Sequence, residues 1–206
     1  MTTSRMKQRG TVLIKNDKKI THKKPIDLSP SKILAKFAKE IALNSNGTIV
    51  DVACGYGRNA ACIASFGVPV VCVDINNDAL EYIKSSISLS LAKPKDFNQL
   101  TTMQLDLIND PWPFEDESLG AIINVHFFHY RLIGFFLRSL KIGGYLFIET
   151  IDGHGGNYLD LPPHGFIKAQ LADAFDIRFL KEKKVGPLQS NSSTVKLLAI
   201  KQKTYK

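Results

Sequence analysis

IVDVACGYGRN, residues Ile49–Asn59, joins an apolar run to a glycine turn and then to a helical segment. Glycine is needed in such a turn because the backbone takes angles that other residues avoid and because a ligand has to approach the main chain closely. The helix that follows offers unpaired N–H donors and a partial positive charge at its N-terminus. The stretch therefore predicts a strand, a ligand-binding turn and a helix.

An acidic residue ends the next apolar run, VCVD, residues Val71–Asp74. A carboxylate at the end of this second strand can accept hydrogen bonds from both ribose hydroxyls of a nucleotide. The glycine turn and the acid are each weak evidence alone. Together, with 17 residues from Gly57 to Asp74, they predict a site for a nucleoside-containing ligand.

Short apolar runs alternate with helical segments along most of the chain. The runs span residues 48–53, 68–73, 101–105, 121–125 and 145–150, and the predicted helices span 58–66, 77–91, 130–140 and 164–174, after a first helix between 29–31 and 46–47. Strands that alternate with helices form a doubly wound parallel sheet. The last two runs, 176–181 and 194–200, are joined by a loop alone, as antiparallel neighbours are. We therefore predict an α/β fold with a mostly parallel, seven-stranded, Rossmann-like sheet that ends in an antiparallel hairpin.

The net charge of +8 is unevenly distributed along the sequence. Residues 1–29 carry +6 and residues 181–206 carry +6, whereas residues 30–180 carry −4. We interpret residues 1–29 as a basic, mobile N-terminal segment and residues 30–206 as one domain. The basic ends either contact nucleic acid or remain solvated lysines, and both interpretations stay open.

Several classes of protein fit the sequence poorly. The longest apolar stretch, residues 121–137, is interrupted by polar residues and is shorter than the ~20 apolar residues of a membrane-spanning helix, so no membrane contact is expected. The three cysteines have no CxxC spacing and are expected to be buried thiols in a reducing cytoplasm. The five histidines have no metal-site spacing, so no metal is expected. GxSxG and GxxxxGK[ST] motifs are absent, which argues against hydrolases and NTP-driven enzymes.

The glycine turn also fits a dinucleotide, since Gly55-x-Gly57-x-x-Ala60 satisfies the fingerprint of NAD-dependent dehydrogenases. Two features argue against that interpretation. Asp51 lies inside the first strand, where the dinucleotide pattern calls for no carboxylate. A dinucleotide fold would also continue with a second parallel half instead of a closing hairpin.

The motifs, taken in order over about residues 30–206, resemble class I methyltransferases that use S-adenosylmethionine (SAM). The matching segments are 51–57 as the first motif, Asp74 as the ribose-binding acid, 105–107 after the third strand, 113–119 before the fourth strand and 140–146 before the fifth. Gly57-Arg58-Asn59 is further similar to the small-molecule branch that includes tellurite-resistance methyltransferases. The sequence departs from the family at Leu119-Gly120, where an aromatic residue followed by Asp is usual.

The resemblance implies in-line transfer of the SAM methyl group, with SAM as the cofactor. It assigns Asp51 to the amino group of the cofactor, the backbone of Gly55–Gly57 to its methionine portion and Asp74 to its ribose. The full set of expected cofactor contacts is Asp51, Ala53, Cys54, Gly55, Gly57, Arg58, Asn59, Asp74, Ile75, Asp106, Leu107, Asn124 and His126.

Candidate catalytic groups follow the fourth strand. They are His126, His129 and Tyr130, because histidine titrates near neutral pH and can accept a proton from the substrate. In the alternative interpretation, His129 or Tyr130 simply begins the next helix. His154 is a further candidate, and its glycine-rich segment, residues 152–158, is either a substrate loop or a plain connector.

The acceptor of the methyl group has three interpretations. The first is a small molecule; the second is tRNA or rRNA held through the basic ends; in the third, the chain is a non-catalytic SAM-binding partner subunit. The family's Asn-Pro-Pro-Tyr motif for base or amide nitrogens is replaced by Asn124-Val125-His126-Phe127, which favours the first.

Overall fold

The computed structural model describes residues 28–89, 99–150 and 160–203. It contains one seven-stranded sheet with the strand order β3-β2-β1-β4-β5-β7-β6. The elements are α1 (Leu34–Asn44), β1 (Thr48–Val52), α2 (Arg58–Ala64), β2 (Val70–Asp74), α3 (Asn77–Leu89), β3 (Leu100–Gln104), β4 (Leu119–Val125), α4 (Tyr130–Ser139), β5 (Leu140–Glu149), α5 (Phe166–Leu171), β6 (Phe175–Lys184) and β7 (Ser193–Lys201). The predicted fold class is confirmed.

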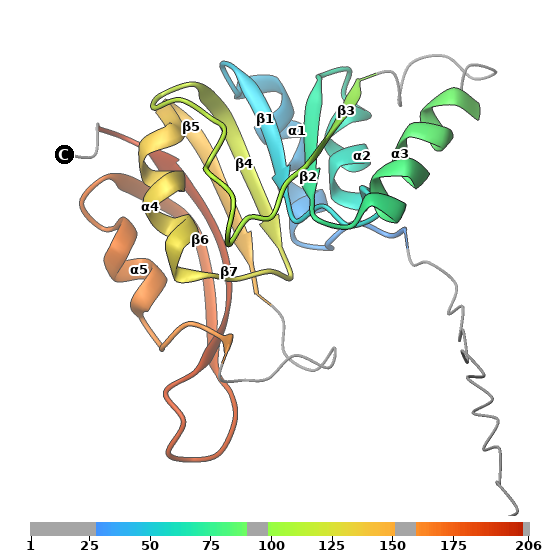
Figure 1. Ribbon diagram of the computed structural model, residues 1–206. Helices are drawn as coiled ribbons and strands as arrows, with labels where there is room; N and C mark the ends of the chain where they lie inside the picture. The colour runs from blue at the N-terminus through green and yellow to red at the C-terminus, as the bar shows by residue number, and fades with distance from the viewer. Residues whose placement is uncertain (1–27, 90–98, 151–159, 204–206) are drawn as a thin grey trace, which may run out of the picture.

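Strands β1 to β5 run parallel, and β7 pairs antiparallel with both β5 and β6. Every residue of β4 is buried, as expected for a central strand that is covered on both faces. One apolar core joins the sheet to α1, α2 and α3, and a second core joins the opposite face to α4 and α5 (Figure 1). The carboxyl ends of the five parallel strands therefore meet at one edge between these two layers.

Predicted and observed bounds differ most in two elements. Strand β5 begins at Leu140 rather than at residue 145, because Leu140 already pairs with Leu119 before the pairing resumes between Tyr145 and Ala121. Helix α5 spans residues 166–171 rather than 164–174, since Gly165 precedes it with a left-handed φ of 81°. The expected N-terminal segment 1–29, apart from its last two residues, and the expected loop 152–158 with His154 lie outside the described residues.

None of the helices in the described part of the chain is long and apolar enough to cross a membrane. The expected division into residues 1–29 and 30–206 stays a prediction.

The departure from the family at Gly120 has a local steric reason. A Cβ atom at Gly120 would lie 2.8 Å from the backbone nitrogen of Gly47 and 2.9 Å from the carbonyl carbon of Asn46. The turn before β1 thus passes directly against the start of β4. Since both contacts are with backbone, a side chain at this place would push the two strands apart.

We expect Gly120→Ala to lower the free energy of unfolding by about 2 kcal/mol, the scale of overpacking in a rigid core. Gly134→Ala is the matched control: Gly134 lies inside α4 and a Cβ there would meet nothing within 4 Å. Alanine at that helical position should raise the free energy of unfolding by about 0.5–1 kcal/mol. Urea unfolding measures both, and equal midpoints for the two variants would contradict the steric explanation.

Candidate functional site

The glycine turn between β1 and α2 has two glycines with different tasks. Both have left-handed backbones, with φ of 54° at Gly55 and 76° at Gly57. A Cβ at Gly57 would lie 2.9 Å from the side chain of Ile83 on α3, whereas a Cβ at Gly55 would meet nothing within 4 Å. Gly57 therefore permits α2 and α3 to pack, and Gly55 keeps the space in front of the turn open.

The carboxylate of Asp74 is fixed beside this turn. Its Oδ2 accepts a hydrogen bond from the Gly55 N–H at 2.7 Å, and its Oδ1 accepts one from the Asn76 N–H at 2.8 Å. The tips of β1 and β2 are neighbours because the strands pair in register, with Val52 opposite Val73. The predicted convergence of the glycine turn and the acid is thus present in the structure.

Asp51 lies beneath the turn rather than in front of it. The residue is 1% exposed, and its Oδ2 accepts a hydrogen bond from the Ala60 N–H at 3.0 Å, within the first turn of α2. Its Oδ1 is buried without a hydrogen-bond partner among the described residues. Burial raises the pKa of Asp51 to about 7, against the lowering effects of the Ala60 hydrogen bond and the Arg58 charge.

A pocket of about 210 Å³ opens at the carboxyl ends of β1 and β4. It is lined by Ala53, Cys54, Gly55, Tyr56, Arg58, Asn59, Val125 and His126. Two lining residues have left-handed backbones although they are not glycine: Ala53 with φ of 55° and His126 with φ of 65°. Such backbones are costly for ordinary residues and gather at functional sites.

Arg58 connects two walls of this pocket. Its guanidinium donates to the carbonyl oxygen of Ser29 at 2.8 Å and lies 3.1 Å from Nδ1 of His126. A guanidinium can only donate, so Nδ1 of His126 is the acceptor and the neutral ring carries its hydrogen on Nε2. The long-range pairing of Arg58 with His126 has no signature in the sequence.

The segment before α1 is tied to the same edge of the sheet, which sequence reasoning missed. The Ser31 N–H donates to Oδ1 of Asn59 at 3.0 Å, and Oγ of Ser31 donates to Oε2 of the buried Glu149. Lys196 pairs with the other oxygen of Glu149 at 2.6 Å. Asn59, an expected cofactor contact, is 4% exposed and fastens this segment.

The remaining expected cofactor contacts are spread along the edge. Exposed Ile75 follows Asp74, while buried Asn124 donates from Nδ2 to the Val52 carbonyl oxygen at 3.3 Å. Leu107 is buried in the core that the sheet shares with α4 and α5.

Asp106 is engaged within its own turn at the end of β3. It accepts hydrogen bonds from the Asn109 side chain and from the N–H groups of Ile108 and Asn109. These bonds hold the pKa of Asp106 below its ordinary value, and the bond from the Asn109 side chain has the largest effect.

The candidate catalytic residues separate into two groups. His126 lines the pocket, whereas His129 is the N-cap of α4 and its Nδ1 accepts from the Arg131 N–H at 3.3 Å. Tyr130 is the first residue of α4 and stands edge-on to Phe128. The alternative interpretation of His129 and Tyr130 as the start of a helix therefore describes what the structure shows.

The three cysteines are free thiols in the structure, and Cys54 and Cys72 are buried. The hydrogen bond with Cys72 and burial raise the pKa of Cys54, so its sulfur stays protonated. Within the described ranges, no three His, Cys, Asp or Glu side chains gather as a metal ion would require.

Comparison with known proteins gives a family for this arrangement. Residues 49–144 match the family described as a methyltransferase domain. Over these residues the chain is similar to that family of methyltransferase domains. No curated protein matches the chain.

Solved structures share the fold of the chain at low identity. A putative methyltransferase from Bacillus halodurans is 19% identical with a TM-score of 0.59, over 82% of this chain and 99% of that one. Geranyl diphosphate C-methyltransferase from Streptomyces coelicolor, in complex with Mg²⁺, geranyl diphosphate and S-adenosyl-L-homocysteine, is 14% identical with a TM-score of 0.60, over 82% and 77%. An rRNA methylase from Streptococcus thermophilus is 19% identical with a TM-score of 0.57, over 84% and 97%.

The residues around the glycine turn fit SAM. The open space at Gly55 admits a ligand to the backbone of the turn, and the carboxylate of Asp74 borders that turn. The buried, unpartnered oxygen of Asp51 places an acid beneath the turn, and an ammonium group nearby would favour its charged form. A ribose at the turn would meet the carboxylate of Asp74, and the buried Asp51 would act on a nearby cation through its charge rather than through direct contact.

The raised pKa of Asp51 makes stability depend on pH. The unfolded carboxyl releases its proton near pH 4, whereas the folded one keeps it to about pH 7. The folded state therefore binds more protons between these values, and the free energy of unfolding falls as the pH rises through this window. The size is a few kcal/mol, since one pKa unit corresponds to about 1.4 kcal/mol.

Asp51→Asn should remove this fall, because asparagine keeps an acceptor for the Ala60 N–H and does not titrate. Urea unfolding from pH 4 to pH 8 measures the slope, with Asp78→Asn on the exposed first turn of α3 as the control. If wild type and Asp51→Asn lose stability equally over this range, the burial of a titrating Asp51 is wrong.

Proposed function

We propose that the protein transfers the methyl group of SAM to a small-molecule acceptor. The observation that supports this most is the pocket in which the glycine turn after β1 meets His126 after β4. Ligands of open α/β sheets bind beyond the carboxyl ends of the strands, and this pocket lies at that edge.

Bound SAM would supply a methyl carbon on a positively charged sulfur, which is an excellent leaving group. The protein then has to hold and align the reactants, and alignment alone can lower a barrier by about 7–11 kcal/mol. The Gly55 turn and Asp74 fix the cofactor end, and His126 borders the place where an acceptor would enter.

His126 borders the acceptor in this proposal, and Arg58 holds its ring. Nδ1 of His126 accepts the hydrogen bond of the Arg58 guanidinium, so this nitrogen does not serve as a base for the acceptor. A thiolate or reduced chalcogen acceptor needs no base, and a hydroxyl acceptor would pass its proton to water.

RNA is the second candidate acceptor. Residues 1–29 hold eight Lys or Arg against two acids, and a surface of this charge binds phosphates. Against RNA, residues 30–180, which include the lining of the pocket, hold twelve basic and sixteen acidic residues, so the basic excess lies in the two ends of the chain. The segment Asn124–Phe127 also lacks the Asn-Pro-Pro-Tyr motif of enzymes that methylate base nitrogens.

Transfer of a labelled methyl group from SAM to pools of metabolites and of RNA tests the proposal. We expect label in the metabolite fraction, and we expect it to persist when the eight basic residues of segment 1–29 are replaced by glutamine. Label found only in RNA, and lost in that variant, would favour the second candidate. Tight SAM binding without transfer to either pool would favour a non-catalytic partner subunit.

Asp74→Ala should weaken SAM binding by roughly 1–3 kcal/mol, because the ribose hydroxyls would lose their acceptor and the Gly55 N–H its partner. Isothermal calorimetry measures the loss. Asp78→Ala, four residues further on and exposed, removes the same charge away from the turn and should bind SAM as the wild type does. Unchanged affinity in Asp74→Ala would remove the ribose assignment.

A further inference from the structure

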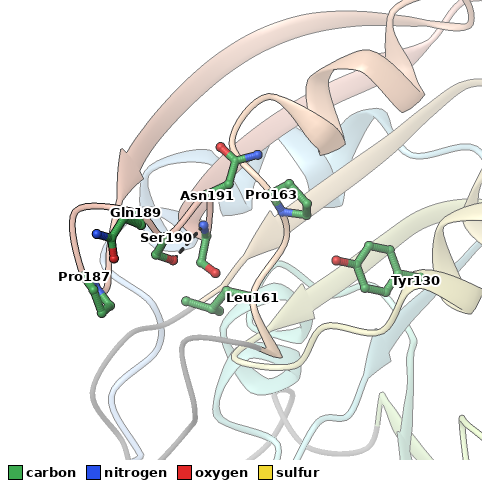
Figure 2. A pocket seen from close by; sticks show the side chains of 8 residues that line it. Tyr130, Leu161, Pro163, Pro187, Gln189, Ser190 and Asn191 are labelled. Atoms are coloured by element: carbon green, nitrogen blue, oxygen red, sulfur yellow. Dashed lines mark hydrogen bonds between the residues drawn. The ribbon is translucent and has the colours of Figure 1, made fainter.

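A second and larger pocket, of about 460 Å³, lies at the same edge of the sheet, beyond the start of α4 (Figure 2). Its walls are Tyr130, the pair Leu161 and Pro163 before α5, and residues of the β6–β7 loop between 187 and 192. This loop reaches the carboxyl edge because β7 runs antiparallel to β5, with Lys196 opposite Glu149. The volume is that of a pocket for a small organic molecule.

The walls of this pocket are fastened to one another by hydrogen bonds. The His164 N–H donates to the Asn191 carbonyl oxygen at 2.6 Å, and the Ser193 N–H donates to the Pro162 carbonyl oxygen at 2.8 Å. Oε1 of Glu182 accepts from the Gly165 N–H and from Oγ of Ser193, both at 2.7 Å. A pocket whose walls are already held loses little conformational entropy when a ligand enters.

Tyr130 lies across the pocket from the β6–β7 loop, and its ring ends in a hydroxyl group directed toward the pocket (Figure 2). The ring is held edge-on by Phe128 at 4.9 Å and by Phe166 at 5.1 Å between centroids. Together with Leu161 and Pro163 it offers a fixed apolar surface against which a flat molecule can pack.

The polar groups of the pocket are neutral. Gln189, Ser190 and Asn191 supply amide and hydroxyl groups, and none of the described residues that line the pocket carries a formal charge. The nearby carboxylate of Glu182 is engaged by Gly165 and Ser193. A charged ligand would lose part of its hydration here without gaining an opposite charge, which is unfavourable.

We propose that this pocket binds the methyl acceptor and that the acceptor is an uncharged, flat molecule with hydroxyl or amide groups. The proposal rests on the proposed function, in which the pocket at the ends of β1 and β4 holds SAM. The short segment from His126 to Tyr130 joins that pocket to this one. His126 and Tyr130 are four positions apart, so their Cα atoms lie at most about 14 Å from one another.

Three phenols of similar size and different charge test the proposal: 4-hydroxybenzamide, which is neutral, 4-hydroxybenzoate, an anion, and tyramine, a cation. Each is titrated to millimolar concentration into the full-length, ¹⁵N-labelled protein. We expect 4-hydroxybenzamide to shift the amide signals of Tyr130 and residues 189–192, and the charged phenols to bind at least about tenfold more weakly. Equal or tighter binding of either charged phenol, or no shift at these residues with the neutral one, would overturn the proposal.

Two variants show whether the pocket itself makes this selection. Gln189→Glu introduces a charge on an exposed loop and should reverse the order, so that tyramine binds more tightly than 4-hydroxybenzamide. Tyr130→Ala should weaken 4-hydroxybenzamide about tenfold while Tyr130→Phe keeps most of the affinity. Tyr82→Ala on α3, outside this pocket, is the control and should change nothing. An unchanged order in Gln189→Glu overturns the proposal.

SAM binding, measured by calorimetry without a phenol, separates this proposal from the proposed function. If SAM binds and the neutral phenol leaves residues 189–192 unshifted, the acceptor pocket is wrong and the function stands. If the phenol shifts these residues and SAM does not bind, the methyltransferase function is wrong and the acceptor role fails with it.

Discussion

The hydrogen bond from the Gly55 N–H to the carboxylate of Asp74 is the contact on which the site depends. It requires two conditions that the fold supplies separately. The parallel register of β1 and β2 places the two strand tips side by side, and the left-handed backbone of Gly55 turns its N–H toward the acid. A second hydrogen bond, from the Cys54 N–H to the Val73 carbonyl oxygen at 3.0 Å, also ties the turn to the second strand. The two bonds together hold the Cys54–Gly55 wall of the pocket beside His126.

The sequence was sufficient for the order and type of the strands because each depends on a local pattern. Short apolar runs separated by helices give parallel strands, and the two last runs without a helix between them give the antiparallel hairpin. The early start of β5 was not predictable. It depends on Leu140 pairing with Leu119 and on Gly144, where a Cβ would lie 2.8 Å from the Lys141 carbonyl oxygen. Such contacts are decided by packing between segments rather than by the propensity of either one.

Within the site, too, local patterns could be predicted and contacts between distant segments could not. The glycine turn and Asp74 were predictable because their residue types and spacing carry the chemistry. The bonds from Arg58 to His126 and from Ser31 to Glu149 were not, since they join residues 68 and 118 positions apart and follow no periodic pattern. Their effect is to place the segment before α1 against the pocket wall. The role of His129 as a helix cap is local and was open as an alternative from the sequence.

The two acids at the ends of β2 and β3 differ in what they can still accept. A carboxylate has about four lone-pair positions. Asp74 accepts two backbone N–H bonds, so two positions remain, which is the number that two ribose hydroxyls require. Asp106 accepts three bonds within its own turn and has about one position left. A nucleoside at this edge would therefore be anchored through Asp74, whereas Asp106 shapes the turn beside it and can contribute at most a single bond.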